Sequence, residues 1–221
     1  MSDQLKIYCV NLGEYIPVSG GQTLHQIYEE IRDRLSFTPV CARVNNKTED
    51  LAFPVFMPKQ VEFLSVKSPS GHRCYIRSLC MVLYRALVTL YPGARLVISH
   101  SVSRGYYCRL EGVKADAAVA AALREEMRRL VDRDLPFERK ERLTPDVIEI
   151  MRRQGLHDKV KLLESLHELY TVYYRLDGVC DCYNGNLVPR TGMLQVFDLV
   201  PYEKGLLLLG PDPADDSRPA T

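Results

Sequence analysis

The residues best suited to chemistry in this 221-residue sequence form one basic and aromatic stretch between residues 67 and 109. It contains seven Lys or Arg residues, five Tyr residues and no Asp or Glu. Arginines contact phosphates and aromatic rings stack on bases, so this composition is typical of an anion or nucleic-acid site. The alternative is a solvated helix face whose tyrosines fill the core and whose acidic partners come from elsewhere. Arg73, Arg77 and Tyr84 are spaced to share one face of the expected helix.

The sequence lacks the motifs of several enzyme classes: it has no GxxxxGK[ST], no GxGxxG after a strand, no GxSxG and no HExxH. Its five histidines are scattered, so no metal pair is expected on a helix face. Its seven cysteines include no CxxC, and only Cys180 and Cys182 are close, so we expect reduced, mostly buried thiols. No local motif supports nucleophilic catalysis by a Cys and a His, and the sequence does not exclude it.

Composition places the chain among ordinary globular proteins, with 46% hydrophobic and 26% charged residues. The 29 basic and 28 acidic residues give a net charge of +1, which argues against a broad electrostatic nucleic-acid binder. No run reaches the roughly 18 apolar residues of a membrane helix, and the N-terminus has no apolar signal region. We therefore expect a cytoplasmic protein with no membrane partner.

Residues 1–66 are predicted to form a β-grasp domain, in which a small sheet carries one covering helix. Apolar alternation predicts strands near residues 5–9, 16–18, 40–44 and 61–65. Thr23 and Gln26 form a capping box that predicts the start of the helix. This part holds six basic and eight acidic residues, so it is not by itself an electrostatic nucleic-acid module.

The remaining chain is predicted to form a second, α+β domain over residues 73–209, after a linker at residues 67–72. A long helix carries an apolar stripe from residue 76 to residue 90. Further helices are expected over residues 115–133, 144–155 and 158–166, and strands over 95–100, 105–110, 169–176, 178–184, 194–200 and 205–209. Asp177-Gly178 predicts a tight turn. Residues 210–221 are expected to be a disordered tail or a linker.

Two segments of the second domain resemble the editing domain that threonyl-tRNA synthetases share with alanyl-tRNA synthetases. Residues 77–110, which contain YPGARL and GYYC, resemble its first motif, and GVCDCYNGNLVPRTG at 178–192 resembles its second. Residues 144–166 resemble the helices between them, and residues 1–66 resemble the TGS domain that precedes it. The resemblance implies an α+β sandwich behind a ubiquitin-like β-grasp domain.

Departures from the family pattern change the expected chemistry. The resemblance implies four residues of a metal-type hydrolytic cluster, and the matching positions here hold Arg77, Met81, Tyr183 and Leu187. Cys182 stands one residue before the family's cysteine, and a single thiol does not make a metal site. We therefore expect no catalytic residue, no metal and no cofactor in this chain. A residual editing-type tRNA hydrolase is the least favoured alternative.

The two-domain combination also resembles a narrower family, the bacterial uridine kinase-like nucleoside kinases that carry both domains ahead of a kinase domain. Four segments carry this resemblance: RSLCMVLY at residues 77–84, SRGYYC at 103–108, HDKVKLLE at 157–164 and YNGNLVPRTG at 183–192. It implies that a kinase domain using ATP and Mg, absent from these residues, follows the tail and is a partner in the same polypeptide.

The leading hypothesis is a non-catalytic accessory or regulatory region that binds RNA, tRNA or a nucleotide-like anion. The alternative is a purely structural or oligomerisation module, in which the arginines pair with acids from other segments. The candidate binding residues are Arg73, Arg77, Arg104, Tyr106, Tyr107, Tyr183 and Asn186.

Overall fold

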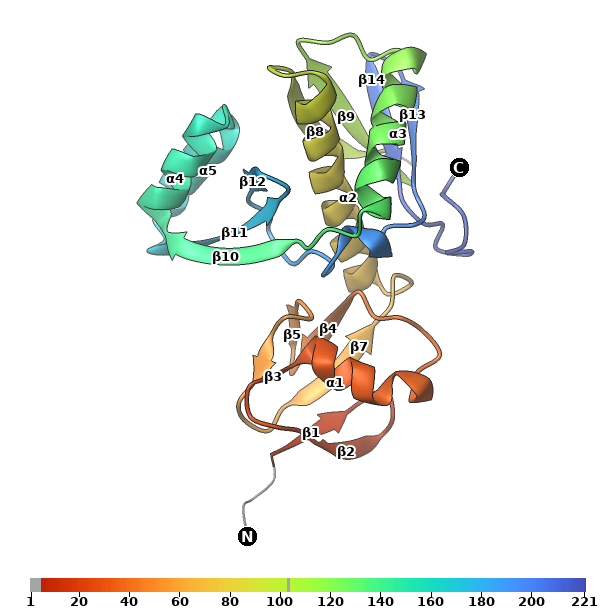
Figure 1. Cartoon of the computed structure of the whole chain (residues 1–221), viewed down its shortest axis with the longest axis vertical. Helices are drawn as coiled ribbons and strands as arrows, with labels where there is room; N and C mark the ends of the chain where they lie inside the picture. Colours follow the sequence, from red (N-terminus) through yellow and green to blue (C-terminus); the bar gives the residue numbers. More distant parts are fainter. Residues whose placement is uncertain (1–4, 103) are drawn as a thin grey trace.

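A computed structural model describes residues 5–102 and 104–221, and its mixed α+β architecture confirms the predicted fold class (Figure 1). The N-terminal lobe, residues 5–66, contains a five-stranded sheet in the order β2-β1-β7-β4-β5, in which β1 and β7 are parallel. The strands of this sheet are β1 (Lys6–Cys9), β2 (Glu14–Pro17), β4 (Cys41–Val44), β5 (Lys47–Glu49) and β7 (Gln60–Leu64).

One helix, α1 (Leu24–Ile31), covers this sheet, and a single turn, η1 (Arg32–Arg34), follows it. The predicted capping box is confirmed: the Gln26 amide donates to Thr23 Oγ1 at 3.2 Å, and the Thr23 amide donates to Gln26 Oε1 at 2.9 Å. The short strands β3 (Gln22–Thr23) and β6 (Pro54–Val55) pair beside the start of the helix.

The second lobe has a four-stranded antiparallel sheet in the order β13-β14-β9-β8, and two helices pack against it (Figure 1). Its strands are β8 (Arg95–Val102), β9 (Gly105–Glu111), β13 (Asp198–Tyr202) and β14 (Gly205–Leu209). Its helices are α2 (Pro69–Leu90) and α3 (Ala117–Asp132), with a turn, η2 (Thr191–Met193), near the end of α3. The predicted apolar stripe of α2 is buried from Ile76 to Leu87, and Leu90 at its end is partly buried. None of the described helices has an apolar stretch long enough to cross a membrane.

Residues 138–181, which we call the lateral lobe, contain a strand that the sequence does not predict. β10 (Glu138–Leu143) pairs with β11 (Tyr170–Leu176), which pairs with β12 (Val179–Asp181). β10 reads ERKERL and is the exposed edge of this sheet, so no apolar alternation marks it. The helices α4 (Thr144–Arg153) and α5 (His157–Leu166) pack on the sheet around a small core of their own.

Residues 67–72, which the sequence predicts as a linker, lead directly into α2. Ser68 caps the helix by accepting a hydrogen bond from the Gly71 amide at 3.1 Å, and Pro69 is its first residue. The expectation of a linker is therefore corrected, since the Ser, Pro and Gly of this segment begin a helix.

The apolar core is continuous from the N-terminal lobe into the second lobe. Val40, Cys41 and Leu64 belong to the same buried cluster as Cys74 and the rest of the α2 stripe. The other buried apolar residues of the N-terminal lobe form a separate cluster between α1 and the sheet. Burial of apolar surface therefore holds the two lobes together, in addition to the covalent chain.

The last twelve residues pack on the second lobe, which corrects the expectation of a disordered tail. Pro211 and Pro219 form an isolated antiparallel bridge, and Ala220 is buried. The physical reason is a set of contacts: the Ala220 amide donates to the Gly210 carbonyl at 2.9 Å, and the half-exposed Arg104 donates at 2.7 Å to the buried Asp212 carboxylate. The high Pro content of the segment predicts disorder, and the sequence gives no sign of these contacts.

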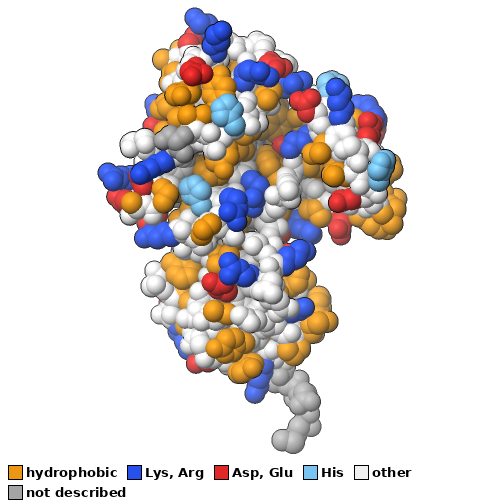
Figure 2. All heavy atoms as spheres, turned by 180° about the vertical axis from the view of Figure 1, so that it is seen from behind, with side chains coloured by type: hydrophobic (Ala, Val, Ile, Leu, Met, Phe, Trp, Pro, Cys, Tyr) orange, Lys and Arg blue, Asp and Glu red, His pale blue; other side chains and the backbone are white. Residues whose placement is uncertain are grey.

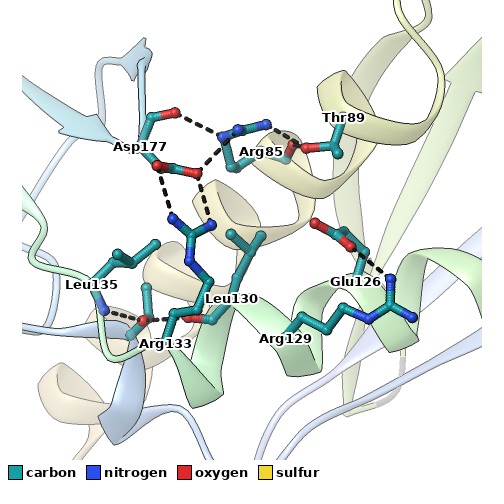
Figure 3. Close-up of polar contacts among 9 residues, drawn as sticks. Arg85, Thr89, Glu126, Arg129, Leu130, Arg133, Leu135 and Asp177 are labelled. Carbon is teal, nitrogen blue, oxygen red and sulfur yellow. Dashed lines mark hydrogen bonds and ion pairs between the residues drawn. The ribbon is translucent and has the colours of Figure 1, made fainter.

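An ionic cluster, which we call the hairpin clamp, fixes the β11–β12 turn against α2 and α3 (Figure 3). Asp177 and Gly178 have φ of +44° and +93°, as the predicted tight turn requires. The Asp177 carboxylate accepts from Arg85 of α2 at 3.0 Å and from Arg133, at the end of α3, at 3.1 and 3.2 Å. Arg85 also donates its Nε to the Asp177 carbonyl at 2.9 Å. The clamp therefore positions β12, and the residues after it, relative to α2.

Candidate functional site

A cavity of about 390 Å³, which we call the central cavity, lies between α2, β8, β9, the start of α5 and the segment after β12. Its wall includes apolar side chains such as Ile76, Leu96 and Val97. Figure 2, which views the molecule from the side opposite to Figure 1, shows hydrophobic and basic side chains meeting in a hollow. The central cavity brings together four of the candidate residues, Arg73, Arg77, Tyr106 and Tyr183.

Arg77 is the central charged residue of the site. Its side chain is half-buried, and its Nε donates to the Asn186 carbonyl oxygen at 3.2 Å. Its guanidinium packs on Gly185, where an added Cβ would lie 2.7 Å away, and Gly185 has φ of +123°. Only glycine adopts this backbone conformation without strain, so residue 185 leaves room for the guanidinium. Arg73 and Tyr84 line the cavity from the same face of α2, as predicted.

Two ion pairs also line the central cavity, Lys159 with Asp181 and Arg95 with Asp158. Sequence reasoning does not single out Lys159 and Asp181. Lys159, in the first turn of α5, lies 5.0 Å from the ring centre of Tyr183 and 3.2 Å from the Asp181 carboxylate. Both come from segments far from α2 in the sequence, and no local motif marks them as its neighbours. The one available signal is the segment resemblance that includes residue 159.

Burial keeps the phenols and thiols around the cavity protonated. Burial and the nearby Asp181 carboxylate raise the pKa of Tyr84 to about 12, and they raise the pKa of Tyr183 well above its ordinary value. Burial also raises the pKa of Cys182, the thiol beside the family's cysteine position, to about 12. At neutral pH these groups are protonated and can donate hydrogen bonds.

A second cavity of about 310 Å³, which we call the junction cavity, lies where the N-terminal lobe meets α2. Arg73, Arg77 and Tyr183 line both cavities. Asn186 lines the junction cavity, and its Nδ2 donates to the Thr48 carbonyl of the N-terminal lobe at 2.8 Å. Five of the seven candidates therefore gather at two cavities that share a wall.

The structure places Arg104 and Tyr107 outside both cavities, apart from the other five candidates. Successive side chains of a strand point to opposite faces, so Tyr106 of β9 reaches the central cavity and Tyr107 does not. Tyr107 packs near Tyr202, with ring centres 6.1 Å apart. Arg104 instead holds the C-terminal segment through its ion pair.

Most basic residues between residues 67 and 109 pair with carboxylates outside this stretch. The alternative of a purely structural or oligomerisation module requires such pairing. Arg73 and Arg77 alone have no carboxylate partner among the described residues. The candidate site therefore depends on two arginines of α2 and not on the whole stretch. The five paired residues are Lys67, Arg85, Arg95, Arg104 and Arg109.

The side chains at the four implied ligand positions do not fit a metal ion. Arg77 is cationic, Tyr183 is a protonated phenol, and Met81 and Leu187 are buried in the apolar core. Within residues 5–102 and 104–221, no three or more His, Cys, Asp or Glu side chains gather as a metal site. Of the four, only Arg77 and Tyr183 line the cavities, and a guanidinium and a phenol are donors that suit an anion.

No protein-family model matches the chain. The curated proteins that resemble it include a threonine-tRNA ligase of Rubrobacter xylanophilus, 29% identical over 188 residues, which cover 85% of this chain and 29% of the ligase. The threonine-tRNA ligase of Desulforamulus reducens is 27% identical, over 81% of this chain and 29% of the ligase. That of Syntrophotalea carbinolica is 28% identical, over 72% of this chain and 26% of the ligase.

The chain thus spans less than a third of the length of these relatives, at most 29% of each. The similarities support the resemblance to synthetases and give no support to a uridine kinase parent. The β-grasp sheet followed by an α+β region fits a TGS domain followed by an editing-like domain. By sequence, this chain is therefore similar to a region of threonine-tRNA ligases, and its mixed α+β architecture fits that similarity.

Proposed function

We propose that this chain is a non-catalytic accessory region of the threonyl-tRNA synthetase type that binds an RNA or nucleotide-type anion at the central cavity. The observation that carries the proposal is Arg77, whose guanidinium has no carboxylate partner among the described residues. It stands where the resemblance implies a residue of a hydrolytic cluster. A permanent positive charge there binds a phosphate but cannot transfer a proton at neutral pH.

The rest of the central cavity supports a ligand with an uncharged, planar part. Its volume of about 390 Å³ falls within the usual range of about 300–1,000 Å³ for small-molecule sites. The ring of Tyr106 and the apolar wall suit a base or a ribose, and stacking contributes about 1–3 kcal/mol per base. Arg73 and Arg77 supply the phosphate contacts.

The test measures binding of a tRNA, a short single-stranded RNA and the nucleoside monophosphates at about 50 mM and about 200 mM salt. We expect the affinity to fall as salt rises. We expect Arg77→Ala to lower it roughly tenfold or more, because a hydrogen bond to a charged group contributes about 1.5–3 kcal/mol.

Arg142→Ala is the matched control, because Arg142 is exposed on the edge strand β10 and lines neither cavity. Equal effects of the two substitutions, or no binding by the unaltered protein, contradict the proposal. Either result favours the structural or oligomerisation module.

We also propose, on the resemblance of residues 77–84, 103–108, 157–164 and 183–192 alone, that a nucleoside kinase domain using ATP and Mg follows this region in its parent protein. The region would then regulate that domain or dock on it. The coding sequence downstream tests this directly. A GxxxxGK[ST] motif supports the kinase, whereas a continuation similar to threonine-tRNA ligases refutes it.

A further inference from the structure

We propose that the junction cavity binds a phosphate group, and that the bound phosphate fastens the N-terminal lobe to the second lobe. The cavity is lined from both sides. Lys47, Thr48 and Glu49 come from β5, whereas Arg73 and Arg77 come from α2. A ligand held by residues of two lobes stabilises their contact, because it binds only when both sets of residues are in place.

The charges around the junction cavity leave it positive. Glu49 pairs with Lys47 at 3.0 Å, and the buried Asp50 pairs with Arg139 at 3.3 Å, so each carboxylate is matched by one cation. The two arginines of α2 have no carboxylate partner in the described part of the chain, and their charge is therefore uncompensated. Guanidinium groups bind phosphate oxygens through charge-assisted hydrogen bonds.

The loop at residues 184–186 holds the Arg77 guanidinium at the cavity wall. The Asn186 carbonyl accepts from its Nε, and Gly185 packs against the group. Within the described residues, the terminal nitrogens of Arg77 have no hydrogen-bond partner, so they remain available to an anion. Asn186 also donates its side-chain amide to Thr48. The loop that positions the arginine is therefore the loop that contacts the N-terminal lobe.

An unpaired hydroxyl lies at the same cavity. Tyr174 of β11 lines it and is 2% exposed, and its hydroxyl has no hydrogen-bond partner within residues 5–102 and 104–221. Burial, together with the Asp50 carboxylate, raises its pKa, so the phenol stays protonated and can donate. Buried polar groups are nearly always paired in native proteins. The Asp50 carboxylate lies beside this hydroxyl, so the phenol adds a protonated group to the site. The contacts to an anion come from Arg73 and Arg77, which have no carboxylate partner among the described residues.

The test titrates the whole chain with inorganic phosphate and compares Lys47→Ala with Glu49→Gln. Both residues line the junction cavity and neither lines the central cavity. We expect phosphate to raise Tm in a saturable way. We expect Lys47→Ala to weaken phosphate binding and Glu49→Gln to strengthen it, each by roughly two- to fivefold, because the substitutions remove charges of opposite sign.

Lys6→Ala is the matched control, because Lys6 is exposed on the same lobe and lines neither cavity. Equal phosphate affinities in all these proteins overturn the proposal. So does a rise in Tm that does not saturate, since stabilisation by excluded salts grows steadily with concentration.

Two further measurements identify the source of the phosphate group and test the fastening. Competition by a nucleoside monophosphate or a short RNA assigns the phosphate to that ligand, and phosphate binding without competition assigns it to free phosphate; each supports the site. Amide exchange at residues 47–49 and 184–186 should slow together when phosphate binds. Protection confined to one lobe overturns the fastening.

The two proposals fail separately. Tyr106→Leu alters only the central cavity, so it should weaken nucleotide or RNA binding while leaving the effect of inorganic phosphate unchanged. If Tyr106→Leu abolishes the phosphate effect, the junction site is overturned. If no nucleotide or RNA binds but phosphate does, the junction site stands without the proposed function.

Discussion

Substitution of Asp177 by Asn removes the charge that joins the β11–β12 hairpin to α2 and α3. The side chains of Asp177 and Arg85 are 26% and 20% exposed, whereas that of Arg133 is 52% exposed. The shielded pair with Arg85 contributes about 1.5 kcal/mol, and the exposed pair with Arg133 about 0.5 kcal/mol. Asparagine keeps one acceptor oxygen, so we expect the free energy of unfolding to fall by about 1–2 kcal/mol.

Thermal unfolding followed by circular dichroism measures this change. For a chain of this size, a loss of about 1–2 kcal/mol lowers Tm by about 2–8 °C. Asp132→Asn is the matched control, because Asp132 is exposed at the end of α3 and has no ion pair among the described residues. Its neutralisation should leave Tm nearly unchanged. A fall for Asp177→Asn no larger than that of the control would refute the role of the hairpin clamp.

The pH dependence gives an independent check of the same reasoning. Hydrogen bonds from Arg133, and the charges of both arginines, hold the pKa of Asp177 below its ordinary value. The stabilising contribution is therefore complete above the ordinary pKa of about 3.9 and is lost as pH falls through the lower, folded value. The Tm difference between the unaltered protein and Asp177→Asn should shrink between about pH 7 and about pH 3. A difference that stays constant contradicts the ionic origin of the effect.

Three other measurements probe the site and the core. Gly185→Ala should weaken nucleotide or RNA binding about as much as Arg77→Ala, because the added Cβ displaces the guanidinium; a binding titration that finds the affinity unchanged would contradict the packing. Ser78→Ala should lower the free energy of unfolding by about 1–3 kcal/mol, because it leaves the buried Val188 amide without the hydroxyl it now reaches at 2.9 Å. Urea unfolding tests this, and a loss below about 0.5 kcal/mol would speak against it. A thiol reagent should modify Cys180 first in the folded chain, since the other cysteines are buried; mass mapping of a different site would disprove this.

The features predicted correctly are those whose signals are local. The capping box at Thr23 and Gln26 depends on residues within one helical turn, and the tight turn at Asp177-Gly178 depends on two adjacent residues. The shared face of Arg73, Arg77 and Tyr84 follows from helical periodicity alone. The sequence therefore places these side chains on their elements correctly before any partner is known.

The features missed depend on partners that are distant in the sequence. The C-terminal segment contacts the second lobe through Arg104 and Asp212, which are 108 residues apart. Lys159 lines the central cavity because the start of α5 and α2 both border it, and no pattern in the sequence predicts that arrangement. By contrast, the separation of Tyr106 from Tyr107 was accessible from the sequence, because neighbouring residues of a strand cannot share a face.

The continuous core has a consequence for dissecting the molecule. A cut near residue 67 would leave Val40, Cys41 and Leu64 uncovered on one fragment and the first turns of α2 uncovered on the other. Each fragment would expose an apolar surface that promotes self-association, although the residues next to the cut are polar. The solubility and stability of the N-terminal lobe expressed by itself would therefore reflect the exposed apolar surface as much as the lobe. In solution the N-terminal and second lobes should tumble together, with one rotational correlation time.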